Sequence, residues 1–350
     1  MAVQRFFRCA FLGIFCLLFS DSVAYASAGT EGGSFLDIPV GAGPASLGSA
    51  YAALASDAYA PILNPGGLGF LKGPELAGQH LSYVQSIRYE QFSLVAPLPS
   101  RHESTIHRGI GLSIQDLGTG EITRTDVANG MPVTGLGSFS SRWSAYNLSY
   151  GQTVTEKLAL GLTGKWIQAK IDDVSAGAYA FDAGSLYRWD DRLSLAVTVT
   201  NAGNRLKFLS QGDNLPLATR IGAAYQPNSH WLITTEGIYR KTGLAGFHLG
   251  GQWQPVEALS LRAGYKTDNL NGLNALAGFT AGMGIHLWGQ ELAYAWVPYG
   301  ELGSAQYFSL VIRFGSRAEE RHNLLRESKL PDLPNEDQQV AQLQGTEVGH

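Results

Sequence analysis

Cysteine, charged residues and long apolar runs are scarce in this sequence. Its two cysteines, Cys9 and Cys16, lie near the start, so the rest of the chain can hold neither a disulfide framework nor a thiolate metal site. Charged residues make up 15% of the 350 residues, too few for a disordered chain, and the formal charge of −4 does not suit a nucleic-acid binder. The mean hydropathy of −0.03 excludes a bundle of membrane helices.

Glycine and aromatic residues are plentiful instead. The chain contains 43 glycines, and 11% of its residues are Phe, Trp or Tyr. The apolar residues alternate with small or polar ones, which is the periodicity of a half-buried β-strand. The composition therefore favours an all-β protein.

Residues 1–28 have the features of a secretory signal. Arg5 and Arg8 give it a positive start, and the apolar run at 9–19 is too short to cross a bilayer as a helix. Small residues in an A-x-A arrangement follow, ending at Ala26 or Ala28. We expect an exported protein; an uncleaved membrane anchor is the alternative.

Strand-like alternation extends from residue 75 to residue 314. Leu160 and Leu162 share one face of a predicted strand, for example, while Gly161 and Thr163 share the other. An even number of strands of about membrane-crossing length is typical of a closed transmembrane barrel. The pattern predicts fourteen strands, at residues 75–85, 87–97, 107–117, 140–153, 156–171, 176–190, 192–204, 216–228, 230–241, 244–255, 257–267, 275–288, 289–298 and 304–314.

One face of these strands is apolar and the other is small or polar. In a membrane barrel the apolar face contacts lipid and the polar face lines the lumen, whereas in a soluble sandwich the apolar face is the core. The polar face has few charges for a solvated surface, and aromatic residues gather near strand ends, so we favour the barrel over a soluble β-domain. The predicted lumen-lining residues are Lys165, Asp182, Arg188, Glu236, Arg240, Arg262, Lys266, Glu291 and Arg313.

Four segments carry a resemblance to a known family. Residues 35–51 (FLDIPVGAGPASLGSAY) and 57–68 (DAYAPILNPGGL) are similar to the opening of the PorV/PorQ-like family of FadL-type outer-membrane barrels. Residues 199–203 (VTNAG) and 294–310 (YAWVPYGELGSAQYFSL) resemble two of its later elements. The family has Arg where Gly43 stands and Ala where Gly66 stands.

The resemblance implies a 14-stranded barrel with an N-terminal hatch, here residues 29–72, folded into the lumen. Pro44 would be the first residue of a small-residue helix at 45–55, and Asn64 would begin a turn. The hatch is either a movable gate or a static plug. Its predicted residues are Gly41, Gly43, Pro44, Gly48, Asp57, Asn64, Pro65, Gly66, Gly67 and Leu68.

Two roles follow from the resemblance. FadL-type members pass hydrophobic molecules across the outer membrane, whereas PorV-like members serve a protein secretion system of the type IX kind. We therefore expect an outer-membrane barrel (residues 73–314) that contacts outer-membrane lipid and transports a hydrophobic small molecule passively. The alternative is a scaffold that handles secreted cargo. The glycine-rich segment 118–139 is predicted to be an extracellular loop.

The charged residues 315–350 are predicted to form a disordered periplasmic tail, so that both termini would lie in the periplasm. This tail is either an inert solvated segment or a site for a periplasmic or secretion-system protein.

Enzyme and cofactor motifs are absent from the sequence. It contains no G-x-S-x-G, G-x-G-x-x-G, Walker A or H-E-x-x-H pattern, so we predict no catalytic residue, metal or cofactor. Some outer-membrane barrels are hydrolases, which leaves Ser113 with His107 as a minor alternative.

Overall fold

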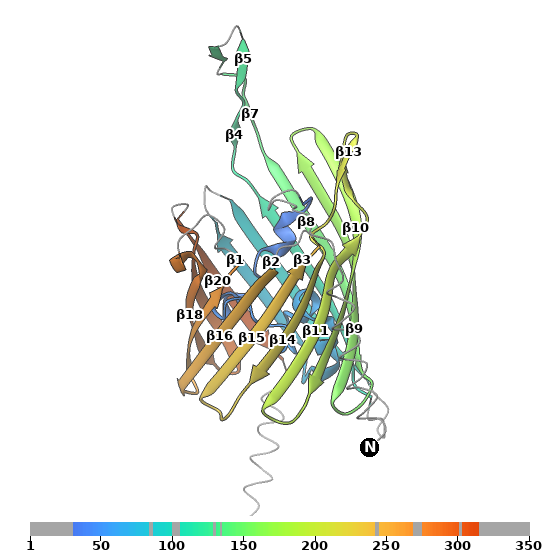
Figure 1. Cartoon of the computed structure of the whole chain (residues 1–350), viewed down its shortest axis with the longest axis vertical. Helices are drawn as coiled ribbons and strands as arrows, with labels where there is room; N and C mark the ends of the chain where they lie inside the picture. Colours follow the sequence, from blue (N-terminus) through green and yellow to red (C-terminus); the bar gives the residue numbers. More distant parts are fainter. Residues whose placement is uncertain are drawn as a thin grey trace, which may run out of the picture.

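Fourteen antiparallel strands close into a barrel in the computed structural model of the chain (Figure 1). The structure describes residues 31–83, 87–99, 106–128, 131–133, 135–241, 245–268, 275–300 and 303–314. The wall strands are β1 (Glu75–Ser82), β2 (Arg88–Leu98), β3 (Arg108–Gly118), β8 (Ser141–Thr153), β9 (Leu158–Ile171), β10 (Val174–Arg188), β11 (Leu193–Gly203), β14 (Ala218–Tyr225), β15 (Trp231–Arg240), β16 (Ala245–Val256), β17 (Leu259–Lys266), β18 (Phe279–Leu287), β19 (Gln290–Pro298) and β20 (Ser304–Arg313).

Pairing of β1 with β20 closes the wall, so none of these strands has an unpaired edge. Such closure leaves no strand edge whose backbone N–H and C=O groups would lack hydrogen-bond partners in lipid. The predicted fold class, an all-β barrel of fourteen antiparallel strands, is confirmed.

Side chains alternate between the two faces of the wall as the sequence predicted. On β9, Leu160 and Leu162 point outward and are 46% and 64% exposed, whereas Thr163 and Lys165 point inward and are buried. Exposed tryptophans gather near one end of the barrel, at Trp189, Trp231, Trp253 and Trp288. An apolar outer band with an aromatic girdle is the pattern of a transmembrane barrel.

The two ends of the barrel differ in the length of their connections. At one end the strands are joined by short turns, such as those between β10 and β11 and between β18 and β19. The other end carries two projecting hairpins (Figure 1). These contain β4 (Ile122–Thr123), β5 (Asp126–Ala128), β6 (Met131–Val133) and β7 (Ser138–Phe139), and β12 (Leu206–Phe208) with β13 (Gln211–Asp213). Long loops are typically extracellular and short turns periplasmic.

The segment predicted as a plain loop at 118–139 is therefore a twisted β-ribbon. β4 pairs with β7 and β5 with β6, and Gly135 and Gly137 adopt positive φ angles near its turns. Between β4 and β5, Arg124 donates to both carboxylate oxygens of Asp172 in the turn between β9 and β10. Local strand pairing and this ion pair therefore order a segment that was predicted as a glycine-rich loop.

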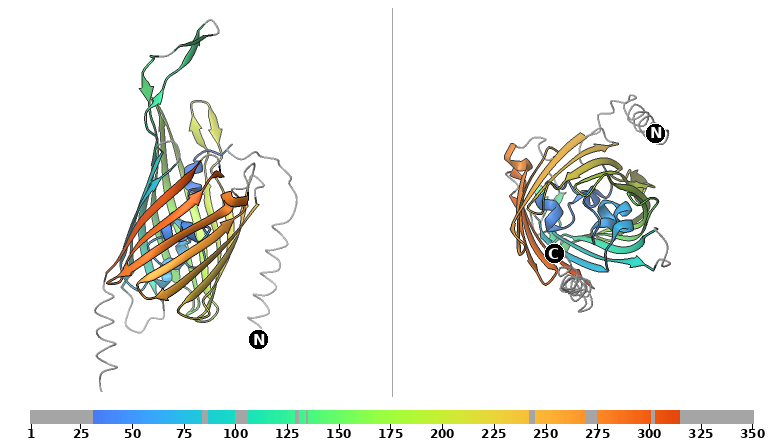
Figure 2. Two further views of the ribbon diagram at one scale, coloured as in Figure 1. Left: turned by 90° about the vertical axis from the view of Figure 1, so that its left-hand side faces the viewer. Right: turned by 90° about the horizontal axis from the view of Figure 1, so that it is seen from below.

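The part of the hatch that the structure describes lies inside the barrel (Figure 2). It contains two 3₁₀ turns, η1 (Ser34–Asp37) and η2 (Pro65–Phe70), and two short helices, α2 (Ala42–Ser46) and α3 (Ala60–Leu63). A third 3₁₀ turn, η4 (Ala275–Gly278), precedes β18. In the described part of the chain, no helix has the length and apolarity needed to span a bilayer.

The prediction of a helix at 45–55 is wrong. Helix α2 starts at Ala42 and ends at Ser46, so Pro44 lies within it instead of at its first position. The helix stops because Gly48 and Ser49 both have φ of 64°, where the chain turns against the wall. A Cβ at Gly48 would lie 2.8 Å from the carbonyl oxygen of Leu249. Contact with the barrel wall therefore overrides the local helix propensity.

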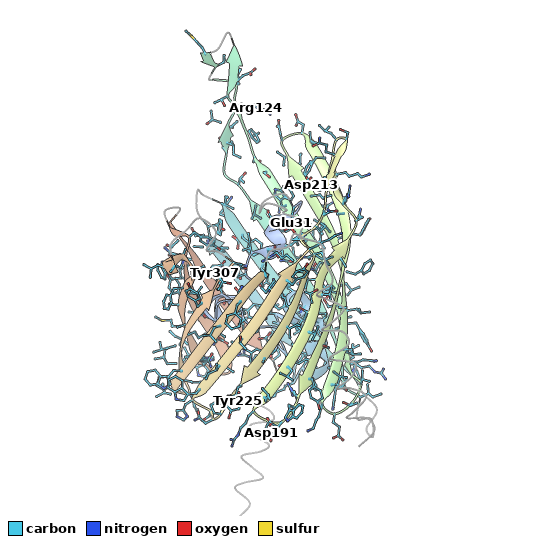
Figure 3. All side chains as sticks on the ribbon, in the orientation of Figure 1. Glu31, Arg124, Asp191, Asp213, Tyr225 and Tyr307 are labelled. Atoms are coloured by element: carbon cyan, nitrogen blue, oxygen red, sulfur yellow. The ribbon has the colours of Figure 1, made fainter. Side chains whose placement is uncertain are left out.

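The described chain begins and ends at opposite ends of the barrel. The N–H of Gly32 donates to the carbonyl of Asn214 (2.9 Å), beside the β12–β13 hairpin, and Figure 3 shows Glu31 and Asp213 at this long-loop end. The N–H of Phe314 donates to the carbonyl of Pro74 (2.9 Å) at the short-turn end. The predicted signal at 1–28 and tail at 315–350 lie outside the described residues, so the periplasmic placement of both termini stays a prediction.

A charge placed on the outer face tests the membrane assignment. Leu162→Arg puts a guanidinium on the lipid-facing band and is expected to lower the free energy of unfolding in lipid vesicles by about 2–4 kcal/mol. Glu156→Arg, in the exposed turn between β8 and β9, is the control and should change it little. Equal stability of the two variants would mean that the outer face is solvated.

Candidate functional site: the hatch and the lumen wall

Side chains of the barrel wall bind the backbone of the hatch directly. The N–H groups of Ala42 and Gly48 donate to the hydroxyls of Ser309 and Thr280, each at 3.1 Å. The N–H of Gly41 donates to the Gln79 side chain. An irregular segment inside a barrel cannot satisfy its own backbone, so these wall groups replace the partners that a helix or water would supply.

The Glu236 carboxylate of β15 accepts three hydrogen bonds, two of them from the hatch backbone. Its Oε2 accepts from the N–H groups of Tyr51 (3.2 Å) and Ala52 (2.9 Å), while its Oε1 accepts from Arg220 (3.0 Å). The Glu236 side chain is only 1% exposed. A carboxylate at this depth needs all three donors, so Glu236 and the 51–52 segment hold each other in place.

The wall also donates to hatch carbonyls. Thr234 donates to Ala50 (2.9 Å) and Thr163 to Pro61 (3.0 Å). In the opposite sense, Asn64 of the hatch donates to the wall carbonyl of Ser185 (3.0 Å). The anchors therefore come from strands around much of the circumference.

Glycines in the wall allow the hatch backbone to approach closely. A Cβ at Gly161 of β9 would lie 2.2 Å from the carbonyl carbon and oxygen of Pro65, and one at Gly264 of β17 would lie 2.1 Å from the Gly48 nitrogen. Real Cβ atoms do not approach other atoms this closely. The inward-facing glycines are thus part of the fit between wall and hatch.

Among the predicted hatch residues, Asp57 organises the middle of the segment. It accepts from the Tyr51 hydroxyl (2.6 Å) and from the Tyr59 N–H (2.9 Å), and Glu75 of the wall accepts from the next N–H, that of Ala58 (3.1 Å). Burial raises the pKa of the Asp57 carboxyl, and the hydrogen bonds from Tyr51 and Tyr59 oppose that rise.

The turn residues at 64–68 pack into the β8–β10 side of the wall. Asn64 is fully buried, donates to the Ala52 carbonyl (2.8 Å) and accepts from the Gly66 N–H (3.0 Å). A Cβ at Gly67 would overlap the Ala55 carbonyl oxygen, at 1.5 Å, and Leu68 is fully buried. This turn is therefore a packed joint between two parts of the hatch.

Gly43 lies beside an arginine of the wall. A Cβ on this residue would be 3.2 Å from a terminal nitrogen of Arg262. The PorV/PorQ-like family that the hatch sequence resembles has Arg at this position. In this chain a guanidinium of the wall, that of Arg262, lies next to the glycine instead.

The predicted lumen charges all lie on inward-facing positions, and most of them are paired. Arg262 pairs with Glu291 (2.7 Å), and Lys165 pairs with Asp182 (2.8 Å). Arg313 bridges Glu291 (3.4 Å) and Glu75 (3.5 Å). The wall charges thus mainly neutralise one another.

Two lumen cations contact groups outside the wall strands. Arg240 pairs with Asp37 of the hatch (3.2 Å) and with Asp268 (3.5 Å), not with a wall glutamate. Lys266 lies over the Tyr299 ring (5.6 Å). Burial would raise the pKa of Asp268, but His248, Lys266 and Arg240 outweigh it and hold that pKa below its usual range. Lys266 and Arg240 therefore stabilise the charged form of Asp268, a loop residue outside the predicted strands.

Arg188 packs over the Phe70 ring at 4.1 Å, a cation–π contact with the end of the hatch. The other wall side chains that bind the hatch backbone were not predicted; they are Gln79, Ser149, Thr163, Thr234, Thr280 and Ser309. They share the inward phase of the strands, but nothing in their spacing shows that they bind a backbone.

The minor hydrolase alternative is not supported by the geometry. His107 and Ser113 lie six positions apart along one extended segment, or about 20 Å. The Ser113 hydroxyl instead accepts from Asn147 (2.9 Å). No cluster of three or more potential metal ligands occurs within the described residues.

Several aromatic side chains pack against one another at the long-loop end of the barrel. On one side, Trp143 of β8 packs against Phe35 of η1 (ring centroids 6.1 Å apart) and Phe208 of β12 (5.7 Å). On the other, Tyr83 packs edge-on against Tyr299 (5.1 Å). We call this set the aromatic collar: Phe35, Tyr83, Trp143, Phe208 and Tyr299. The collar adds aromatic surface at the long-loop end, beside the charged groups of Arg240, Lys266 and Asp268.

The comparisons place the fold. No protein-family model matches the chain, and a search of curated proteins gives no match. The toluene transporter TodX of Pseudomonas putida has a similar structure, with a TM-score of 0.54 and 16% identity over 78% of this chain and 96% of TodX. The monoaromatic hydrocarbon channel CymD gives 0.50 and 13%, over 78% and 96%. A Pseudomonas aeruginosa FadL homologue gives 0.48 and 12%, over 75% and 95%. At such identities the likeness to TodX and CymD establishes a shared barrel fold and nothing finer.

A matched pair of glycines on one strand tests how the hatch is seated. Gly161→Ala should force the Pro65 carbonyl away from the wall and lower the free energy of unfolding by about 1–3 kcal/mol, the usual cost of overpacking. Gly164→Ala, on the outward face of the same strand, meets nothing closer than the Phe181 ring at 3.9 Å and is the control. Thermal unfolding of both variants in one detergent measures the difference; equal midpoints would contradict a close-packed hatch.

Proposed function

We propose that this protein is an outer-membrane channel for the passive diffusion of hydrophobic small molecules. The observation that carries the proposal is the aromatic collar, a set of packed aromatic side chains at the long-loop end of a barrel whose interior holds the hatch. A hydrophobic molecule gains favourable burial at the collar, whereas a hydrated solute gains nothing there. The FadL-type fold and the names of TodX and CymD as hydrocarbon channels support the same substrate class.

The mechanism needs no cofactor and no energy source. A molecule enters from outside, binds at the collar, passes the hatch and leaves through the wall or on the periplasmic side, moving down its own gradient. Individual neutral hydrogen bonds contribute about 0.5–1.5 kcal/mol each, so release of one or two anchors at a time is thermally accessible. Release of the whole hatch would break them together and is not required. The hatch therefore acts as a gate only through local movements.

The alternative is a scaffold or cargo-handling component of a protein secretion system, as the PorV/PorQ resemblance implies. The projecting ribbon β4–β7 favours a protein partner because Met131, next to its tip, and Leu136, between β6 and β7, are 73% and 47% exposed. Residues 315–350 are the proposed site for a partner on the periplasmic side.

Uptake of toluene by cells producing the protein tests the proposal. We expect uptake above that of cells without the protein, and a several-fold reduction when the collar is cut back by Trp143→Ala with Phe208→Ala. Trp253→Ala removes an outward-facing aromatic and should leave uptake unchanged. Heat-shifted gel mobility confirms that each variant is folded.

Uptake no higher than in cells without the protein would contradict the channel proposal. A stoichiometric protein partner that is lost on truncation after Phe314, found together with that negative result, would instead support the secretion role.

A further inference from the structure

A groove runs across the outer surface of the wall over β2, β3, β8, β9 and β10. Its volume is about 570 Å³, and it is open on the outer side. Its upper edge is a row of outward side chains that pair in register, namely Phe92, Ile114, Tyr146, Trp166 and Tyr179. The Tyr146 and Trp166 rings lie 5.5 Å apart. The groove thus faces the lipid side of the barrel, not the lumen.

The floor of the groove is made by one glycine. Gly164 stands in the next row down, in register between Leu148 and Phe181, which are 57% and 66% exposed. The other residues of this row on the five strands are large: Leu94, Leu112, Leu148 and Phe181. The absence of a side chain at Gly164 therefore leaves a slot about the width of an acyl chain. A Cβ at Gly164 would contact only the edge of Phe181, at 3.9 Å, so the wall itself does not require glycine here.

A row of basic side chains lies on the long-loop side of the groove. Arg88, Arg142 and Lys170 occupy one outward row, in which Gly118 separates the first two. Each lies four residues along its strand from an aromatic of the upper edge: Phe92, Tyr146 and Trp166. Four residues span about 13 Å, or about 10 Å along the membrane normal at the usual strand tilt. When the aromatic row lies at the border of the hydrocarbon, the cations therefore lie at the level of lipid headgroups.

Asp116 and Glu90 lie in the row between the cations and the aromatic side chains, but both carboxylates already have hydrogen-bond partners. Asp116 accepts from the Nε of Arg142 (2.9 Å) and from Ser144 (2.5 Å), and Glu90 contacts His80 (2.7 Å). Arg142 uses Nε for this contact and its side chain remains 73% exposed, so its terminal nitrogens face outward. Lys170, its partner in the register, is also exposed.

We propose that this face binds a phosphorylated, acylated glycolipid of the outer leaflet, with one acyl chain in the groove beside Gly164 and a phosphate on Arg142 and Lys170. The groove lies toward the long-loop end, which is the extracellular end of such barrels, and this fixes the leaflet. Charge complementarity selects a lipid with phosphates over a neutral one, and guanidinium groups suit phosphate oxygens. The proposal depends on the membrane location of the barrel and is independent of any transport.

Native mass spectrometry of the detergent-purified protein with added bisphosphorylated lipid A tests the site. We expect one lipid A retained per barrel, with affinity lowered about tenfold or more by Arg142→Gln with Lys170→Gln, the effect of losing charge-assisted hydrogen bonds. Gly164→Leu fills the slot and should lower affinity to a similar extent. Lys241→Gln and Gly251→Leu are matched controls for an exposed cation and an outward glycine elsewhere on the barrel, and both should bind as the unmodified protein does.

Three results would overturn the proposal: unchanged affinity in either groove variant, equal affinity for lipid A lacking its phosphates, or equal affinity for phosphatidylglycerol. Heat-shifted gel mobility shows that each variant is a folded barrel before binding is measured. Because toluene uptake is not part of this experiment, its outcome is separate from that of the channel proposal.

Discussion

The hydrogen bonds between wall side chains and the hatch backbone are the interaction on which the rest of this structure depends. The barrel ladder satisfies its own backbone, but the hatch is too irregular to do so. Gln79, Glu236, Thr280 and Ser309 supply acceptors for its N–H groups, and Thr163 and Thr234 supply donors for its carbonyls. Without these groups a polar chain would lie in a lumen with no partners, at a cost that the packing of alanines could not offset.

The same requirement explains why the inner face of the wall is small and polar. A large inward side chain at Gly161 or Gly264 would occupy the space of the hatch, and an apolar one at Thr280 or Ser309 would leave its amides unpaired. Most lumen charges are neutralised within the wall, and Arg240 extends this pairing to Asp37 of the hatch. The hatch is thus held to the wall by both hydrogen bonds and an ion pair.

Much of the barrel could be predicted from the sequence because strand periodicity is a local property. The alternation of Leu160 and Leu162 with Gly161 and Thr163 determined both the strand and its faces, and thirteen further strands followed from the same rule. The hatch is different. A small-residue run after Pro44 has helical propensity, yet α2 ends at Ser46 because Gly48 turns against the wall, a contact made with residues about 200 positions away. Similarly, Asp268 lies in a loop, so its pairing with Arg240 follows from topology and not from spacing.

Amide hydrogen exchange of the hatch tests this account most directly. If wall side chains hold the hatch backbone, the amides of Ala42, Gly48, Tyr51, Ala52 and Ala58 should exchange as slowly as those of the β9 strand, and Glu236→Ala should speed exchange at Tyr51 and Ala52 before elsewhere. Exchange of these amides at the rate of an exposed loop in the unmodified protein would contradict it, because the hatch would then be solvated and held only by its covalent link to β1.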